Sequence, residues 1–276
     1  MRVIEKSADM AALVGQKPVV LVPTMGGLHE GHAALVREAR RLGGKSGTVV
    51  VSIFVNPTQF GPGEDFDSYP RDLESDREIC AGAGADVIFH PSADEMYLDD
   101  ASVTIRELSL SRLLCGASRP GHFAGVCTVV VKLFNLVRPD MAVFGKKDYQ
   151  QLAIIRRLVR DLNLGIDIRG LETVRESDGL AMSSRNSYLS DDQRQQAPAL
   201  RRALLAANTE LVRDEMVAGI AKQLQTEAPL GQIDYLELVD AESLEKIEAV
   251  TAQPALLAAA IFFGKTRLID NLEISR

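Results

Sequence analysis

The stretch VVLVPTMGGLHEGHAALVREAR, Val19 to Arg40, contains an apolar run, a glycine-rich turn and a helical pattern in that order. Valine and leucine runs of this length suit a strand that is buried on both faces of a sheet. After the turn, apolar residues recur at spacings of three and four, which is typical of an amphipathic helix. The stretch therefore predicts a strand that leads through a tight turn into a helix.

The same order of strand and helix repeats along the first 172 residues. The expected strands are Val19–Val22, Val49–Val55, Val87–Phe89, Met141–Phe144 and Ile166–Ile168. The expected helices are Gly31–Leu42, Arg71–Ala81, Gly125–Val137 and Tyr149–Leu162. Alternation of this kind predicts an α/β protein with a Rossmann-like, doubly wound parallel sheet.

The pattern changes after Ser177. A polar and alanine-rich helical region, Asp191–Glu227, is followed by the strand-like DYLELVD and by an apolar stretch that predicts a β-hairpin turning near Gly264. We therefore expect a Rossmann-like ligand-binding domain over residues 1–173. A smaller C-terminal α+β domain, expected to act as a lid, covers residues 174–276.

Composition limits the possible functions of the chain. Its 276 residues carry a net charge of -7, which argues against nucleic acid as a partner, because proteins that bind nucleic acid normally have a basic face. Charges near the N-terminus and the lack of a long apolar run argue against a signal peptide or a membrane span, so we expect a cytoplasmic protein. The three cysteines are widely separated and do not have the spacing of a metal site.

The glycine-rich turn suits a phosphate ligand. The N-terminus of a helix presents unpaired N–H groups and a partial positive charge, and His29 and His32 share a face of its first turn. Three alternatives compete with this interpretation. The first is a P-loop: Gly26 and Gly31 have its spacing, but the Lys and the Ser or Thr of that motif are missing. The second is a zinc site, which would need more ligands than the two histidines. The third is a helix cap formed by both histidines.

Three further loops follow strands or precede helices. Lys147 is placed to contact a phosphate, although Asp148 and Gln151 together also fit a capping box. Ser183, Ser184 and Arg185 could surround an oligophosphate. Asn56 and Gln59 supply amides suited to a small substrate, although Asn-Pro is also a common turn former.

Taken in order, five segments resemble the pantothenate synthetase family: PTMGGLHEGH, FVNPTQF, RPGHFAGV, FGKKDYQQL and DGLAMSSRN. The HEGH sequence is similar to the HIGH signature of the nucleotidyltransferase superfamily, and AMSSRN is similar to its KMSKS loop. The resemblance extends over nearly the whole chain. It implies an enzyme that joins pantoate to β-alanine at the expense of ATP, with pantoyl adenylate as the intermediate and pyrophosphate and AMP as products.

The resemblance also implies roles for individual residues. The ATP site would comprise Met25, Gly26, Gly27, Leu28, His29, Glu30, Gly31, His32, Gly145, Lys146, Lys147, Asp148, Val174, Met182, Ser183, Ser184 and Arg185. Among these, the catalytic set would be His32, His29, Lys147, Ser183, Ser184 and Arg185. The pantoate and β-alanine site would comprise Gln59, Gln151, Asn56, Arg119 and His122.

Mg²⁺ is expected to accompany ATP, with Asp76 as the candidate protein ligand. Ser75 stands where a second acidic residue can occur in the family, so the ATP phosphates are expected to supply most of the metal coordination. We expect the partners to be ATP, pantoate, β-alanine and a second copy of the chain in a homodimer. Two rival functions stay open: a nucleotidyltransferase of the same architecture, and a nucleotide-binding regulatory module without turnover.

Overall fold

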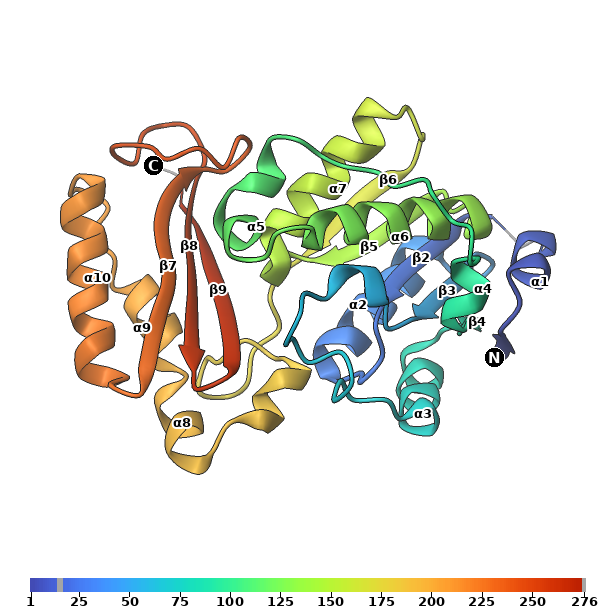
Figure 1. Ribbon diagram of the computed structural model, residues 1–276, viewed down its shortest axis with the longest axis horizontal. Coiled ribbons are helices and arrows are strands. Elements are labelled where there is room, and N and C mark those ends of the chain that lie inside the picture. The colour runs from blue at the N-terminus through green and yellow to red at the C-terminus, as the bar shows by residue number, and fades with distance from the viewer. Residues whose placement is uncertain (14–16, 275–276) are drawn as a thin grey trace. The chain divides into compact units, whose positions relative to one another are not determined.

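The computed structural model describes residues 1–13 and 17–274 (Figure 1). Contacts within the chain define two compact units. Unit 1 comprises Met1–Leu108, Arg119–Lys146 and Ile154–Glu172, and unit 2 comprises Ser109–Ser118, Lys147–Ala153 and Thr173–Arg276. Unit 2 thus includes two short segments from the region that we assigned to the first domain, and the division at residue 173 stays a prediction.

Unit 1 contains a six-stranded parallel sheet in the order β1-β4-β3-β2-β5-β6. Its strands are β1 (Arg2–Ile4), β2 (Val19–Thr24), β3 (Thr48–Ile53), β4 (Val87–Phe89), β5 (Met141–Gly145) and β6 (Asp167–Leu171). The expected parallel sheet is confirmed. The sequence patterns missed β1, whose three residues include the charged Arg2 and so form no apolar run like that of β4.

The structure describes six helices in this part of the chain, of which four were expected and the two shortest were not. They are α1 (Ser7–Ala12), α2 (Glu30–Gly43), α3 (Leu73–Ala83), α4 (Ala93–Met96), α6 (His122–Val137) and α7 (Tyr149–Asp161), with 3₁₀ turns η1 (Pro57–Gln59) and η3 (Lys146–Asp148). Buried side chains of α2 and α3 pack on one face of the sheet, where Val36 contacts the cluster that contains Val22 and Val51. Helix α6 lies on the opposite face of the sheet, where it contacts β2 (Figure 1).

The strand order positions the site. From β2 the chain proceeds outward through β3 to β4, and then returns to the other side of β2 to form β5. The carboxyl ends of β2 and β5 therefore flank the point where the direction of winding reverses. Ligands of open α/β sheets bind at such a point, and the glycine-rich turn directly follows β2.

Unit 2 contains an antiparallel sheet in the order β7-β8-β9. Its elements are η2 (Leu110–Arg112), α5 (Leu114–Ser118), η4 (Ser184–Tyr188), α8 (Asp191–Gln196), α9 (Ala199–Leu205), α10 (Arg213–Glu227), β7 (Gly231–Asp240), β8 (Ala255–Phe263) and β9 (Thr266–Ile274). The expected hairpin turns at Gly264, which has a left-handed φ of 59°.

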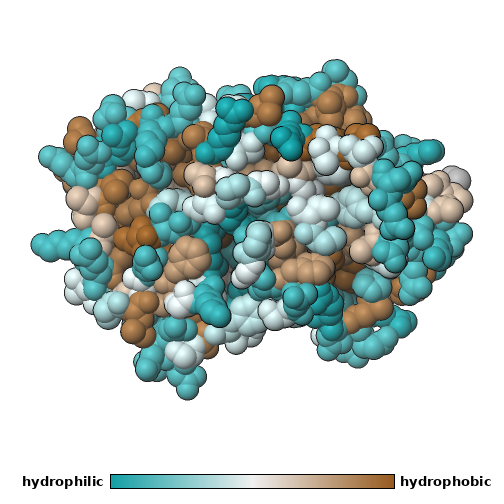
Figure 2. All heavy atoms as spheres, in the orientation of Figure 1, coloured by the Kyte–Doolittle hydropathy of each residue, from teal (hydrophilic) through white to brown (hydrophobic). Residues whose placement is uncertain are grey.

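The expected helical region of unit 2 is divided into three helices. Its buried residues, such as Leu204 and Leu224, pack against buried residues of the sheet, such as Leu257. Figure 2 shows hydrophobic side chains gathered beside β7, and further hydrophobic groups lie among hydrophilic ones elsewhere on the visible face. Among the described residues, no helix has both the length and the apolar character that a membrane crossing requires.

Candidate active site

The glycine-rich turn after β2 is held by a buried carboxylate. Gly26 and Gly27 have left-handed φ values of 85° and 61°, which side chains with a Cβ rarely adopt. This geometry directs the N–H of Gly27 to Asp76 Oδ2 at 3.1 Å and the N–H of Leu28 to Asp76 Oδ1 at 2.7 Å. Asp76 is only 2% exposed, and burial raises the pKa of its carboxyl group while the two amides oppose that shift.

The two histidines form the first turn of α2. His29 is the N-cap residue, and its Nδ1 accepts a hydrogen bond from the N–H of Gly31 at 3.1 Å. The Nδ1 of His32 accepts from the N–H of His29 at 3.3 Å, and the ring centroids lie 4.2 Å apart. Because each Nδ1 is an acceptor, each neutral ring carries its proton on Nε2, which can donate to an anion.

These contacts show that the helix-capping alternative is correct for the δ-nitrogens. The capping geometry also fixes the tautomer and the orientation of both rings, so capping and phosphate binding are compatible. Glu30, the first residue of α2, forms an exposed ion pair with Arg37.

Asn56 lies at the centre of a buried hydrogen-bond network after β3. It is 1% exposed and caps η1, with its Oδ1 accepting from the N–H of Thr58 and from the hydroxyl of Tyr97 at 2.9 Å. Its Nδ2 donates to Gln59 Oε1 at 3.0 Å and to the main-chain oxygen of Gly125 at 3.2 Å. Asn56 therefore organises this loop through both its carbonyl and its amide group.

Gln59 connects this network to the glycine-rich turn. Its Nε2 lies 3.0 Å from Met25 Sδ, so a predicted pantoate residue contacts a predicted ATP residue at the carboxyl ends of two adjacent strands. The main-chain oxygen of Gln59 lies 2.8 Å from His122 Nδ1, and His122 Nε2 lies 3.0 Å from Arg119 Nη1. Arg119 also donates from Nε to Glu64 at 2.7 Å, and this guanidinium lowers the pKa of the Glu64 carboxyl group. Asn56, Gln59, Arg119 and His122 thus form one cluster in unit 1.

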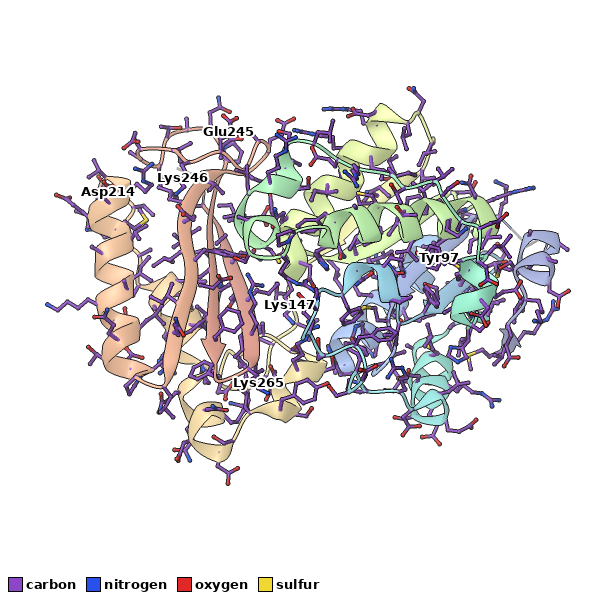
Figure 3. All side chains as sticks on the ribbon, viewed as in Figure 1. Tyr97, Lys147, Asp214, Glu245, Lys246 and Lys265 are labelled. Atoms are coloured by element: carbon purple, nitrogen blue, oxygen red, sulfur yellow. The ribbon has the colours of Figure 1, made fainter. Side chains whose placement is uncertain are left out.

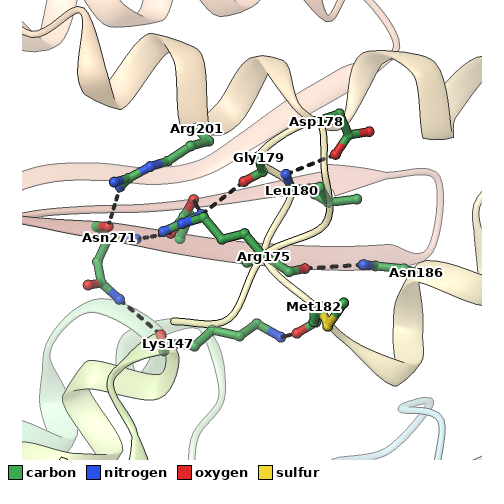
Figure 4. Close-up of polar contacts among 11 residues, drawn as sticks. Lys147, Arg175, Asp178, Gly179, Leu180, Met182, Asn186, Arg201 and Asn271 are labelled. Carbon is green, nitrogen blue, oxygen red and sulfur yellow. Dashed lines mark hydrogen bonds and ion pairs between the residues drawn. The ribbon is translucent and has the colours of Figure 1, made fainter. Parts of the chain in front are cut away.

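The two neighbouring lysines after β5 belong to different units. Lys146, in unit 1, donates to Glu172 at 2.5 Å. Lys147, in unit 2, donates from Nζ to the main-chain oxygen of Met182 at 3.0 Å (Figures 3 and 4). Burial lowers the pKa of the Lys147 ammonium group. Asp148 and Asp270 oppose that shift, whereas the cationic side chains of Arg185 and Arg175 add to it.

The loop Met182–Arg185, called the serine and arginine loop below, is fixed by hydrogen bonds within unit 2. The main-chain N–H of Met182 donates to Val174 at 3.0 Å, and Ser183 caps η4 by accepting from the N–H of Arg185. Asn186 donates to Glu176 Oε1 at 2.8 Å and to the main-chain oxygen of Ala181 at 3.1 Å. These contacts hold Met182, Ser183, Ser184 and Arg185 in one compact turn.

Gln151 does not form the capping box that its spacing from Asp148 would allow. Within the described part of the chain, its side chain makes no hydrogen bond. The adjacent Gln150 is the structural residue instead. It is buried, accepts from the N–H of Cys115 at 3.0 Å and donates to the main-chain oxygens of Leu110 and Leu113.

The side chains around Asp76 do not form a site that could bind Mg²⁺ through protein ligands. Both oxygens of the candidate ligand Asp76 accept hydrogen bonds from the glycine-rich turn, and the group is buried. In residues 1–13 and 17–274, no three His, Cys, Asp or Glu side chains are grouped so that they could hold a metal ion. Asp76 as a metal ligand stays a prediction, and its observed contacts support a role in shaping the turn.

Four residues that contact the loops of the site were not expected from the sequence. Tyr97 lies next to α4 in an acidic stretch with no catalytic pattern, so no signal identified it (Figure 3). Asp270 and Asn271 lie in a hairpin whose pattern indicated only strands. Gly125 did carry a signal, because it is a glycine inside an apolar helix. A Cβ on Gly125 would lie 2.4 Å from the main-chain oxygen of Thr58.

Comparison with known proteins gives consistent matches over the chain. The family model described as pantoate-beta-alanine ligase matches residues 2–273. A pantothenate synthetase from Akkermansia muciniphila is 54% identical over 264 residues, which cover 93% of this chain and 92% of that protein. The crystal structure of the enzyme from Thermus thermophilus is 46% identical and superposes with a TM-score of 0.94 over 100% of both chains. A pantoate-beta-alanine ligase from Francisella tularensis, complexed with beta-gamma ATP and β-alanine, is 32% identical with a TM-score of 0.81 and covers 99% of this chain and 97% of that one.

Proposed function

This chain belongs to the pantoate-β-alanine ligase family, and we infer that it joins pantoate to β-alanine in two steps at the expense of ATP. The observation that carries the two-step scheme is the contact between Gln59 and Met25. It brings the predicted acid site against the predicted nucleotide turn, as the transfer of a nucleotide to a carboxylate requires.

In the first step, a carboxylate oxygen of pantoate attacks the α-phosphorus of ATP. The bond to the bridging oxygen breaks, pyrophosphate leaves, and pantoyl adenylate is formed. No side chain acts as a nucleophile, so the chain contributes by orienting the reactants and stabilising negative charge on the phosphates. The Nε2–H groups of His29 and His32 and the N-terminus of α2 contribute to this stabilisation.

Other residues are proposed to contact the phosphates as well. Lys147 and Arg185 provide positive charge, and Ser183 and Ser184 provide hydroxyl donors. The remaining proposed ATP contacts are made by Met25, Gly26, Gly27, Leu28, Glu30, Gly31, Gly145, Lys146, Asp148, Val174 and Met182. Gln59 binds pantoate, with Asn56, Arg119 and His122 holding its loop, and Gln151 presents a further amide.

In the second step, the uncharged amine of β-alanine attacks the carbonyl carbon of the adenylate. The carbon–oxygen bond to the phosphate breaks, AMP leaves, and the amine loses a proton as the amide forms. Mg²⁺, bound by the ATP phosphates, would neutralise part of their charge. The proposed assembly is a homodimer that works in the cytoplasm.

Isotope exchange between pyrophosphate and ATP tests the scheme. We expect exchange to require pantoate but not β-alanine, because the adenylate forms before the amine is needed. AMP should exceed one equivalent per active site only when β-alanine is present. Exchange that persists without pantoate, or that requires β-alanine, would reject the two-step scheme.

The same assay separates the rival functions. A nucleotidyltransferase would leave the nucleotide on its product and would not release AMP on addition of an amine. A regulatory module would bind ATP without any exchange.

A further inference from the structure

Two adjacent residues of β9 contact two separate segments of unit 2: one leads into the proposed nucleotide-binding loop, and the other contains Lys147. Asp270 is 3% exposed and accepts a bidentate ion pair from Arg175, with Nη1 at 2.7 Å from Oδ2 and Nη2 at 2.9 Å from Oδ1. Arg175 also donates to the main-chain oxygen of Gly179 at 3.1 Å (Figure 4). Asp270 thereby holds the turn that leads into the serine and arginine loop.

Asn271 holds the other segment. Its Nδ2 donates to the main-chain oxygen of Lys147 at 3.0 Å (Figure 4). Its own main chain is fixed on both sides, because its N–H donates to Asp270 Oδ1 at 2.8 Å and its oxygen accepts from Arg201 at 3.1 Å. The contact to Lys147 therefore comes from a rigid strand.

The hydrogen bond from Lys147 to Met182 closes a ring of contacts. In this ring, Asp270 of β9 binds Arg175, whose segment leads into the loop Met182–Arg185. Lys147 then connects Met182 of that loop to Asn271 of β9. We propose that Asp270 and Asn271 are positioning residues for ATP, which set the placement of Lys147 relative to the loop Met182–Arg185 before the nucleotide binds. This inference rests on the proposed function, because it requires that Lys147 and the loop contact ATP.

Physical considerations favour positioning over simple stabilisation. Burying an ion pair such as Arg175–Asp270 costs desolvation energy, and apolar residues of similar volume would often stabilise a fold equally well. A bidentate pair, however, fixes orientation as well as distance. Groups that are already fixed lose less conformational freedom when a ligand binds, so they bind it more tightly.

The negative charge of Asp270 has a second effect on Lys147. Four charged groups act on this ammonium: the carboxylates of Asp148 and Asp270 favour its charged form, and the side chains of Arg175 and Arg185 disfavour it. Removing the charge of Asp270 should therefore lower the pKa of Lys147 further.

The first test compares Asn271→Ala with Asn208→Ala. Asn208 is an exposed asparagine of unit 2, and its side chain also bonds a backbone group, the N–H of Glu210. We expect Asn271→Ala to raise the KM for ATP about tenfold, as for one lost hydrogen bond, with little change in kcat at saturating ATP. Asn208→Ala should leave both constants unchanged, and Asn271→Gln should restore part of the ATP affinity.

The second test uses Asp270→Asn, which keeps the shape of the side chain. We expect the KM for ATP to begin its rise at a lower pH than in the wild type, because Lys147 loses its proton earlier. If this variant fails to fold, Asn271→Ala still decides the question.

Two results would overturn the inference. One is an unchanged KM for ATP in Asn271→Ala, and the other is an equal loss in both asparagine variants. Lys147→Ala distinguishes this failure from a failure of the proposed roles. If Lys147→Ala impairs ATP use and Asn271→Ala does not, only the positioning role fails, whereas unimpaired ATP use in Lys147→Ala rejects both.

Discussion

The Nζ atom of Lys147 lies 3.0 Å from the main-chain oxygen of Met182, and both residues lie within unit 2. An ammonium group that donates to the loop Met182–Arg185 is already placed beside the groups proposed to bind phosphate. Burial lowers the pKa of this ammonium group, so it loses its charge at a lower pH than an exposed lysine does.

We predict that the KM for ATP rises as the pH increases through the folded pKa of Lys147, because the neutral amine no longer attracts phosphate. Lys147→Arg should abolish this rise, since a guanidinium stays charged. The measurement is the KM for ATP against pH, with the exposed Lys265→Arg as the matched control (Figure 3). An alkaline rise that survives in Lys147→Arg would contradict the assignment.

The same group should affect stability with a defined sign. A lysine whose folded pKa is below its unfolded pKa binds fewer protons in the folded state, so stability increases with pH between the two values. Lys147→Met should lack this increase. Urea unfolding of wild type and variant over the alkaline range measures it, and parallel curves for the two proteins would count against a lowered pKa.

His32→Ala should lower the rate of adenylate formation about a hundredfold, the scale for losing one preorganised donor to a developing phosphate charge. Because His32 Nδ1 also accepts from the N–H of His29, this variant should lose about 1 kcal/mol of stability as well. His32→Asn provides an acceptor for that N–H without the Nε2 donor. We expect it to recover stability but not rate, as measured by thermal unfolding and pyrophosphate exchange. Recovery of both would show that His32 acts only as a cap.

Gln151→Ala should raise the KM for pantoate much more than the KM for ATP, while its melting temperature stays near that of the wild type. The reason is that its amide makes no hydrogen bond within the described part of the chain. Gln150→Ala is the informative comparison, because it removes three hydrogen bonds of a buried side chain and should be strongly destabilising. A clear drop in melting temperature with unchanged pantoate kinetics would reject the ligand role of Gln151.

Asp76→Asn should raise the KM for ATP without changing the Mg²⁺ concentration needed for half-maximal activity. An amide nitrogen cannot accept from the turn, so one of the two hydrogen bonds to Gly27 and Leu28 is lost. Asp72→Asn, on the same helix, is the control because its cap needs only one acceptor oxygen. A greater Mg²⁺ requirement with an unchanged KM for ATP would instead identify Asp76 as a metal ligand.

The sequence by itself determined the order of the longer strands and helices and the chemistry of the loops. The run VVVSIFV and the helical spacing after His29 are local patterns. The predicted ends of β3 and α2 therefore lie within one or two residues of the observed ends. The five family segments likewise identified the family, because each is continuous in the chain.

Only the tertiary structure decided which side chains act together. Asp76 and Gly27 are hydrogen-bonded although they lie 49 residues apart in the sequence, and Asn271 and Lys147 are hydrogen-bonded at a separation of 124 residues. No local period encodes such pairs, because they arise where separate elements pack against each other. For the same reason the structure assigned Gln150, not Gln151, to the support of α7: neighbouring residues of a helix point in different directions, and only the packed neighbours show which one is buried.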